Sequence, residues 1–289
     1  MASRSDQSKS AVVAWLTTAG AAFLLLFSAQ GASARDYAVY ESEGAELAYT
    51  DNGSGDTVII LHGFDGAFEP ALTPLAERLS PSFRVIGIDQ RGHGRSDKPH
   101  GEDAYGKHLA TDVLKLMDHL GIPTAHLIGH SMGGIVALNL AANYPERFHS
   151  AVTIGNGLFT RAELKLIGWL IKGKFAWARV KAFVGINGES PRPEHDSVAL
   201  LLLVGSLHEL TVSEEQAAAI KVPLMGMRGG PDDDPSDTVE QLAQVNPAVE
   251  MIRIESEDHL STLKCETCLT ALEVFLIRHS AAVLLQPAR

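Results

Sequence analysis

A serine flanked by glycines is the first feature of this sequence that could carry chemistry. Residues 129–133 read Gly-His-Ser-Met-Gly, between a short apolar run at 126–130 and a longer one from residue 135. In this pattern a tight turn exposes the serine hydroxyl between a strand and a helix, and glycines let the turn pack closely. The N–H groups that begin the helix favour developing negative charge. We therefore predict that Ser131 is a nucleophile.

A serine hydroxyl is a weak nucleophile until a base accepts its proton, and the chain holds twelve histidines that could act as that base. His259 is favoured because it follows the last predicted strand, in DHLSTL. A loop at the carboxyl end of that strand would bring it over Ser131. Any other histidine is expected to be a surface residue or a satisfied core residue.

A carboxylate should orient this histidine and stabilise its charged form. The loop after the predicted strand at 223–228 reads GGPDDDPSD and supplies four acids: Asp232, Asp233, Asp234 and Asp237. Asp232, three residues after Gly229, is the preferred candidate, and Asp233, three residues after Gly230, competes with it. Asp234 precedes a proline, which favours an extended backbone. The alternative to a catalytic role is that these acids are simply solvated, as in most acidic loops, or that they form a calcium site, as in a few.

An oxyanion formed at a substrate carbonyl needs N–H donors. The backbone N–H of Met132, directly after Ser131, is one candidate. The N–H of Phe64 is the second, in the loop His62-Gly63-Phe64-Asp65 after the predicted strand at 57–62. His62-Gly63 could also be a simple strand-ending turn, and the two interpretations are compatible. This chemistry requires no metal and no organic cofactor.

These residues need elements that hold them at one edge of a sheet. Two short strands are predicted within 37–53, with a turn at Glu43-Gly44. Short apolar segments then predict strands at 57–62, 84–89, 126–130, 151–154, 223–228 and 249–254. Helical spacing is clear at 108–121 and 135–145. Buried strands that alternate with helices predict an α/β fold with a doubly wound, mostly parallel sheet.

One segment interrupts the alternation. Residues 158–217 contain helical stretches at 161–183 and 197–210 around GINGESPRP. We interpret it as a helical cap inserted between two parts of the core, 36–157 and 218–289. Its aromatic residues suggest an apolar substrate pocket, although aromatics at helical spacing more often pack a core. They are Trp169, Phe175, Trp177 and Phe183.

The N-terminal residues 1–34 have the layout of a secretory signal peptide. Arg4 and Lys9 precede an apolar run at 11–27, and Ala32-Ser33-Ala34 follows. We expect an exported protein, periplasmic or secreted, that begins near Arg35. The apolar run is at the lower limit for a membrane span. An uncleaved anchor is therefore the alternative, and membrane contact is expected only in that case.

The charge and the cysteine content of the chain limit which partners and metal sites are expected. A formal charge of −11 argues against nucleic acid, which requires a basic surface, so the expected partner is a small-molecule substrate. Cys265 and Cys268 are the only cysteines, so no second pair exists to complete a zinc site. They are expected to form a local disulfide or to remain two inert thiols.

Over nearly all of residues 36–280 the chain resembles capped serine esterases and lipases of the α/β-hydrolase-fold superfamily. The resemblance is carried by LHGF (61–64), DQRGHGRSDKP (89–99), LGIPTAHLIGHSMGG (120–134), VPLMGMRGGPDDD (222–234) and DHLSTL (258–263). It implies the chain order Ser, Asp, His for the triad and a Gly-x-x-Asp spacing before the acid. The implied reaction is hydrolysis of a carboxylic ester of a small apolar substrate through an acyl-enzyme.

Other bonds fit the same triad. Lactones, thioesters and the carbon–carbon bonds of diketones are alternatives. Serine at 131 makes the chain dissimilar to the dehalogenase and epoxide-hydrolase branches of the superfamily. A resemblance to those branches would imply an aspartate at this position. A non-catalytic, hydrolase-like ligand-binding protein is a further alternative. Such a protein usually has a broken triad, whereas every role here has a candidate residue.

Overall fold

The computed structural model describes residues 37–64, 66–183, 196–230 and 238–280, with 174–183 described as backbone only. The segment 1–34 and the aspartates of the 231–237 loop lie outside this part of the chain. The signal peptide and the choice of Asp232 therefore stay predictions.

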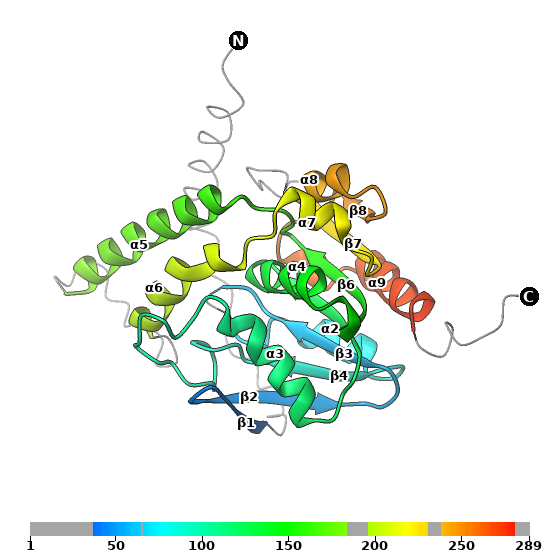
Figure 1. Cartoon of the computed structure of the whole chain (residues 1–289), viewed down its shortest axis with the longest axis horizontal. Helices are drawn as coiled ribbons and strands as arrows, with labels where there is room; N and C mark the ends of the chain where they lie inside the picture. The colour runs from blue at the N-terminus through cyan, green and yellow to red at the C-terminus, as the bar shows by residue number, and fades with distance from the viewer. Residues whose placement is uncertain (1–36, 65, 184–195, 231–237, 281–289) are drawn as a thin grey trace, which may run out of the picture.

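The fold is built on one eight-stranded sheet (Figure 1), with the strand order β1-β2-β4-β3-β5-β6-β7-β8. The strands are β1 (Ala38–Ser42), β2 (Ala45–Asn52), β3 (Thr57–Leu61), β4 (Arg84–Ile88), β5 (Ala125–His130), β6 (Phe148–Ile154), β7 (Leu224–Gly229) and β8 (Glu250–Ile254). β2 pairs antiparallel with β1 and β4, and every pair from β4 to β8 is parallel. The predicted mostly parallel, doubly wound sheet is confirmed.

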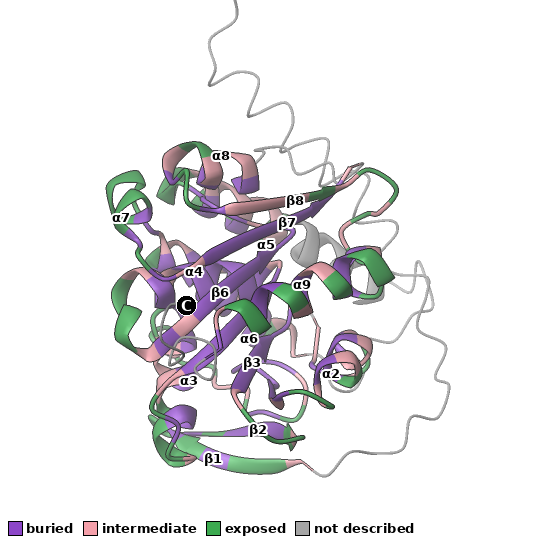
Figure 2. Cartoon of the chain, turned by 90° about the vertical axis from the view of Figure 1, so that its right-hand side faces the viewer, coloured by how far each residue is buried: buried purple, intermediate pink, exposed green. Residues whose placement is uncertain are grey.

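Helices connect the parallel strands and cover both faces of the sheet (Figure 2). They are α2 (Thr73–Leu79), α3 (His108–His119), α4 (Met132–Asn143), α5 (Arg161–Phe183), α6 (Ser197–Ser206), α7 (Glu214–Ala219), α8 (Thr238–Val245) and α9 (Glu266–Arg278). Three short 3₁₀ turns accompany them in the described residues: η1 (Pro145–Arg147), η2 (Leu207–Leu210) and η3 (Ser261–Leu263). The helices α2, α7 and α8 were not predicted from the sequence, and they are only six to eight residues long.

The two faces of the sheet carry separate hydrophobic cores, because neighbouring strand residues point to opposite sides. On one face Ile59 and Leu61 of β3 pack with residues of α3 and α4. On the other face Val58 and Ile60 pack with residues of α2 and α9. All five residues of β3 are buried. This two-sided burial explains why the parallel strands are continuously apolar in the sequence.

Between β6 and β7 the described residues form helices and no strand. α5 and α6 pack closely, since a Cβ built on Gly168 of α5 would lie 2.7 Å from the carbonyl oxygen of Val204. In Figure 1 both helices lie at the side of the molecule away from α9. The boundaries of a separate cap domain stay a prediction.

Cys265 and Cys268 form a disulfide at the start of α9, with their Cα atoms 5.2 Å apart. Of the two alternatives that the sequence left open, the structure contains the bridge. Cys265 is also the N-cap residue of α9, and its Sγ accepts the N–H of Cys268 at 3.0 Å. None of the helices in the described ranges is both long and apolar enough to cross a bilayer.

Candidate active site

Ser131 occupies a sharp turn between β5 and α4. Its backbone has φ 54° and ψ −118°, a conformation that residues with a side chain rarely adopt. The turn is held on both sides, since the Ser131 N–H donates to the carbonyl of Ile154 at 2.8 Å and the Ser131 carbonyl accepts from Gly134 N–H at 2.8 Å. The side chain is half-buried although residues on both sides of it are buried.

The two glycines around this serine are required by close backbone packing. A Cβ on Gly129 would lie 2.1 Å from the carbonyl oxygen of Gly133. A Cβ on Gly133 would lie 2.4 Å from the carbonyl oxygen of Leu61, at the end of β3. Any side chain at either position would therefore push the turn away from the sheet edge.

His259 lies at the same edge of the sheet, in the loop after β8. A Cβ built on Gly155, which follows β6, would lie 2.6 Å from Nδ1 and Cε1 of the His259 ring. Gly155 has φ +73°, and the residue before it, Ile154, binds the N–H of Ser131. The structure thus brings His259 and Ser131 to the carboxyl ends of β5 and β6, where the sequence places reactive groups.

Asp258 shapes the turn that carries His259. Its carboxylate accepts the N–H groups of Leu260 at 2.9 Å and Ser261 at 2.7 Å. The Ser261 backbone N–H is the largest of the effects that lower the pKa of Asp258. Asp258 therefore holds the turn that leads into η3, which gives a physical reason for an acid at this position.

The loop after β3 borders Ser131 directly. A Cβ on Gly63 would lie 3.1 Å from Cβ of Ser131. Phe64 follows Gly63 and is half-buried, with its ring 6.2 Å from the ring of His93. Met132 is buried at the first position of α4. Both predicted oxyanion donors therefore belong to backbone segments that flank the serine.

His62 holds this loop in place through hydrogen bonds. Its Nε2 accepts the backbone N–H of Gln90 at 2.9 Å, and its Nδ1–H donates to the Gly63 carbonyl at 2.7 Å. The Gln90 side-chain amide donates in turn to the His62 carbonyl at 2.7 Å. Burial is the main cause that lowers the pKa of His62, so the ring is neutral with its proton on Nδ1.

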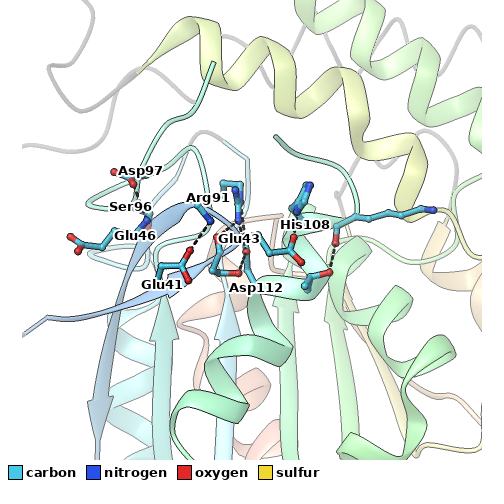
Figure 3. A network of polar contacts seen from close by, with 12 residues as sticks. Glu41, Glu43, Glu46, Arg91, Ser96, Asp97, His108 and Asp112 are labelled. Carbon is cyan, nitrogen blue, oxygen red and sulfur yellow. Dashed lines mark hydrogen bonds and ion pairs between the residues drawn. The ribbon is translucent and has the colours of Figure 1, made fainter. Parts of the chain in front are cut away.

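The loop that carries Gln90 is itself fixed by buried charges (Figure 3). Arg91 donates two hydrogen bonds to the carboxylate of Asp112 on α3, at 2.7 and 3.0 Å. It also donates to the carbonyl of Ser42 at 2.8 Å. The neighbouring Asp89 is buried and accepts the N–H groups of Phe68 and Arg95. The chain from β4 is thus tied to β1 and α3, and through Gln90 to the Gly63 turn.

The two ends of the 231–237 loop, which contains Asp232, border the site. Gly230 N–H donates to the carbonyl of Ile254, and a Cβ on Gly229 would lie 2.1 Å from the Glu257 carbonyl oxygen. Thr238 accepts, through Oγ1, the N–H of Gly157 at 3.0 Å. Asp232 itself lies outside the described residues, so the structure does not test its role. Among the described residues no three His, Cys, Asp or Glu side chains gather as metal ligands would.

A small apolar cavity lies beside α4. It is lined by Ile135 and Leu138 of α4, Phe159, Leu164 of α5, and Leu210. Trp169 does not contribute to such a pocket, because its side chain is 70% exposed on α5. This corrects the interpretation of Trp169 as a pocket residue. The side chains of Phe175, Trp177 and Phe183 are outside the described part.

The structure therefore gathers Ser131, Met132, His259 and the Phe64 loop. No role was predicted from the sequence for the supporting residues His130, Gln90 and Asp258. A usable signal existed for His130, since it lies between Gly129 and Ser131. His130 Nε2–H donates to the His259 carbonyl at 2.8 Å.

Comparisons with known proteins agree with this architecture. A model of the family described as "alpha/beta hydrolase fold" matches residues 56–204. The 2-hydroxy-6-oxo-6-phenylhexa-2,4-dienoate hydrolase of Comamonas testosteroni is 38% identical over 114 residues. That match covers 38% of this chain and 40% of the relative, so the chain spans well under half of its length.

Solved structures are similar over a larger part of the chain. A thermophilic esterase from Thermogutta terrifontis has a TM-score of 0.68 and 21% identity, over 86% of this chain and 100% of the esterase. The enol-lactonase from Burkholderia xenovorans has a TM-score of 0.66 and 22% identity, over 84% of this chain and 100% of the lactonase. At these identities the similarity shows the fold.

Proposed function

Because the chain belongs to the alpha/beta hydrolase fold family, we propose that it is a serine hydrolase that cleaves a carboxylic ester of a small apolar substrate. The observation that carries this proposal is the backbone of Ser131. It holds a costly conformation, φ 54° and ψ −118°, at the edge of the sheet where His259 also lies. Such strain persists where the surrounding structure requires it, and active sites are common places for it.

The proposed reaction proceeds through a covalent acyl-enzyme. Ser131 Oγ attacks the ester carbonyl carbon while His259 takes its proton, and the carbonyl oxygen becomes an oxyanion. The N–H groups of Met132 and Phe64 stabilise that oxyanion. The alkoxide leaves with the proton from His259, and water, activated by His259, then releases the acid.

The acid of the triad is proposed to be Asp232, which would accept the ring N–H of His259. The described ends of its loop support this role. Gly230 is bound to Ile254 at the end of β8, four residues before Asp258, and the loop returns at Thr238 beside Gly157. The first anchor borders the segment that carries His259, and Gly157 of the second lies two residues after Gly155, which faces the His259 ring.

Fluorophosphonate labelling tests the nucleophile. The wild type should be labelled, and Ser131→Ala should remain folded but unlabelled. Ser82→Ala, at an exposed serine outside the site, is the matched control and should label like the wild type. Equal labelling of Ser131→Ala would exclude this serine as the nucleophile. p-Nitrophenyl esters of increasing acyl length then measure the preference for apolar acyl groups.

Separate Asp232→Asn and Asp233→Asn variants test the acid. Loss of the carboxylate that orients the base should lower kcat/KM by up to ~10⁴. We expect that loss for Asp232→Asn and near wild-type activity for Asp233→Asn. The opposite result would move the acid to Asp233.

A second candidate is cleavage of a lactone or of a carbon–carbon bond on the same residues. It is favoured by the names of the similar proteins, a dienoate hydrolase and an enol-lactonase. Assays with a lactone and with a 2-hydroxy-6-oxo-dienoate, run beside the ester panel, distinguish it. A much higher kcat/KM on either compound would replace the ester assignment.

We also propose that the protein is exported after removal of residues 1–34. The support is the order of Arg4, Lys9, the apolar run at 11–27 and Ala32-Ser33-Ala34. Mass spectrometry of the natively produced protein should find an N-terminus near Arg35. A retained Met1 or Ala2 would favour the anchor instead.

A further inference from the structure

The helix α5 carries a charge opposite to that of the chain. The chain has a formal charge of −11, yet the sequence of α5 contains a single acid, Glu163, and six cationic residues. These are Arg161, Lys165, Lys172, Lys174, Arg179 and Lys181. Figure 1 shows α5 at the outer edge of the molecule, beyond α6. A concentration of positive charge at one edge of an acidic protein calls for a physical explanation.

Packing fixes which side of α5 faces solvent. Leu164 is buried, and Gly168 lies too close to Val204 of α6 for any side chain at that position. Ile167 and Ile171 are partly buried against the core. The helix therefore cannot rotate without losing these contacts, and its other side remains in water.

The side in water holds one aromatic residue among cations. Arg161, Lys165, Trp169 and Lys172 are all exposed, and Trp169 is 70% exposed. At 100° per residue they fall within about 80° of arc, along about 16 Å of helix. We call these four residues the α5 stripe. None of its three cations has an ion-pair partner in the described part of the chain.

Glu163 does not neutralise the stripe. It is half-buried, and its carboxylate accepts the N–H and the hydroxyl of Thr160 at 2.8 and 2.9 Å. It therefore serves the first turn of the helix. The stripe keeps Arg161 and Lys165 without an ion-pair partner among the described residues, on one side of Trp169. The ammonium of Lys172, at the other end of the stripe, lies against Gly205 in the last turn of α6.

We propose that the α5 stripe docks this protein on an anionic lipid membrane. Tryptophan prefers the headgroup level of a bilayer, where its apolar ring leaves water and its N–H remains hydrated. Lysine and arginine beside it would contact lipid phosphates. Each cation near an anionic leaflet contributes about fivefold in binding, so three contribute on the order of 100-fold. Nucleic acid is a poorer partner for the stripe, because it would require a larger basic surface and the rest of the chain is acidic.

This docking does not depend on the function of Ser131. The stripe lies on the solvent side of α5, whereas Leu164, on its buried side, lines the cavity beside α4. The interaction should require anionic lipid and should weaken in high salt, because exposed charges are screened.

The test uses the chain from Arg35 onward, which is the form that the export proposal predicts, with Trp177→Phe. Trp15 is absent from that form, so Trp169 is the only tryptophan. Vesicles contain brominated phosphatidylcholine, either alone or mixed with phosphatidylglycerol. We expect Trp169 emission to shift to the blue and to be quenched only with phosphatidylglycerol, and the effect to disappear in high salt. Lys165→Gln with Lys172→Gln should weaken binding about 30-fold.

The matched control moves the reporter to the opposite side of the molecule. Trp169→Phe with Val274→Trp places it at an exposed position of α9, far from α5 in Figure 1. Its emission should not be quenched. Equal quenching of both reporters, quenching by phosphatidylcholine alone, or no quenching of Trp169 would overturn the proposal. A change of Trp169 emission with protein concentration in the absence of vesicles would also overturn it, in favour of contact with a second copy.

Discussion

The ring of His130 lies against the ring of His259, with centroids 4.8 Å apart and planes at 50°. Its Nε2–H also donates to the His259 carbonyl at 2.8 Å. Burial is the main cause that lowers the pKa of His130 to about 3, so this ring is neutral near pH 7. His130 therefore supports His259, the proposed base, through packing and one hydrogen bond, and as a neutral ring it places no positive charge beside it.

Removal of the His130 donor should lower turnover. His130→Phe keeps a ring in place but loses the hydrogen bond, and we expect kcat to fall about tenfold with KM nearly unchanged. His130→Gln retains an N–H donor and should recover part of the loss. Steady-state kinetics on the best ester measure both variants. Wild-type kcat in His130→Phe would show that the contact does not position the base.

A methyl group at Gly155 should disable the site without unfolding the protein. The Cβ of Gly155→Ala would lie 2.6 Å from the His259 ring and displace it. A misplacement of about 1 Å costs about 100-fold in rate. Gly44→Ala is the control, because Gly44 has a similar φ of +79° but open space around it.

Thermal unfolding and fluorophosphonate labelling separate the two effects of this substitution. Both alanine variants should lose a similar, small amount of stability from the backbone alone. Only Gly155→Ala should lose labelling. Equal labelling rates in the two variants would mean that His259 does not need this position.

The ion pair of Arg91 and Asp112 should be costly to break. The side chains are 3% and 5% exposed, and burial raises the pKa of Asp112. Arg91→Met leaves a buried carboxylate without its partner, so unfolding free energy should fall by about 3–5 kcal/mol. Arg84→Met removes a similar but more exposed pair with Asp51 and should cost about 1 kcal/mol or less. Equal losses in urea unfolding would contradict the difference in burial.

His126 should make the protein less stable in acid. It is fully buried, and burial is the main cause that lowers its pKa to about 4, with a smaller effect from His149. The unfolded chain, with an ordinary histidine pKa near 6.5, binds the proton more readily. Stability should therefore fall as the pH drops from about 6.5 to about 4, by up to about 1.4 kcal/mol per pH unit.

His126→Asn tests this slope, because its side chain can still hydrogen-bond Ser150, which contacts His126 Nδ1 at 2.8 Å. Urea midpoints at pH 7 and pH 5 should differ less in the variant than in the wild type. The variant retains His130, whose pKa is also low. Parallel pH profiles for the two proteins would assign the acid sensitivity elsewhere.

The sequence predicted the strands well because burial on both faces leaves a simple signal, a continuous apolar run such as TVIIL in β3. It did not predict α2 or α8, which form only a few turns. The residues of α2 are stabilised by the same core as α9, about 190 residues later.

The candidate nucleophile and base could be predicted because one stands in a glycine pattern and the other follows the last strand. Their supports could not be predicted in the same way. The contact of Gln90 with His62 depends on β3 and β4 lying side by side in one register, which places residues 28 positions apart at the same edge. The choice of the triad acid also could not be fixed from the sequence. Gly229 and Gly230 are adjacent, and either could begin the Gly-x-x-Asp spacing.

The positive φ of Ser131 sets up a trade-off between stability and activity at a single residue. A backbone in this region costs a residue with a side chain about 1–3 kcal/mol, whereas glycine adopts it freely. Ser131→Gly should therefore unfold at a higher temperature than Ser131→Ala, although both lack the hydroxyl. Selection for thermal stability alone would favour the loss of the side chain that the proposed chemistry requires.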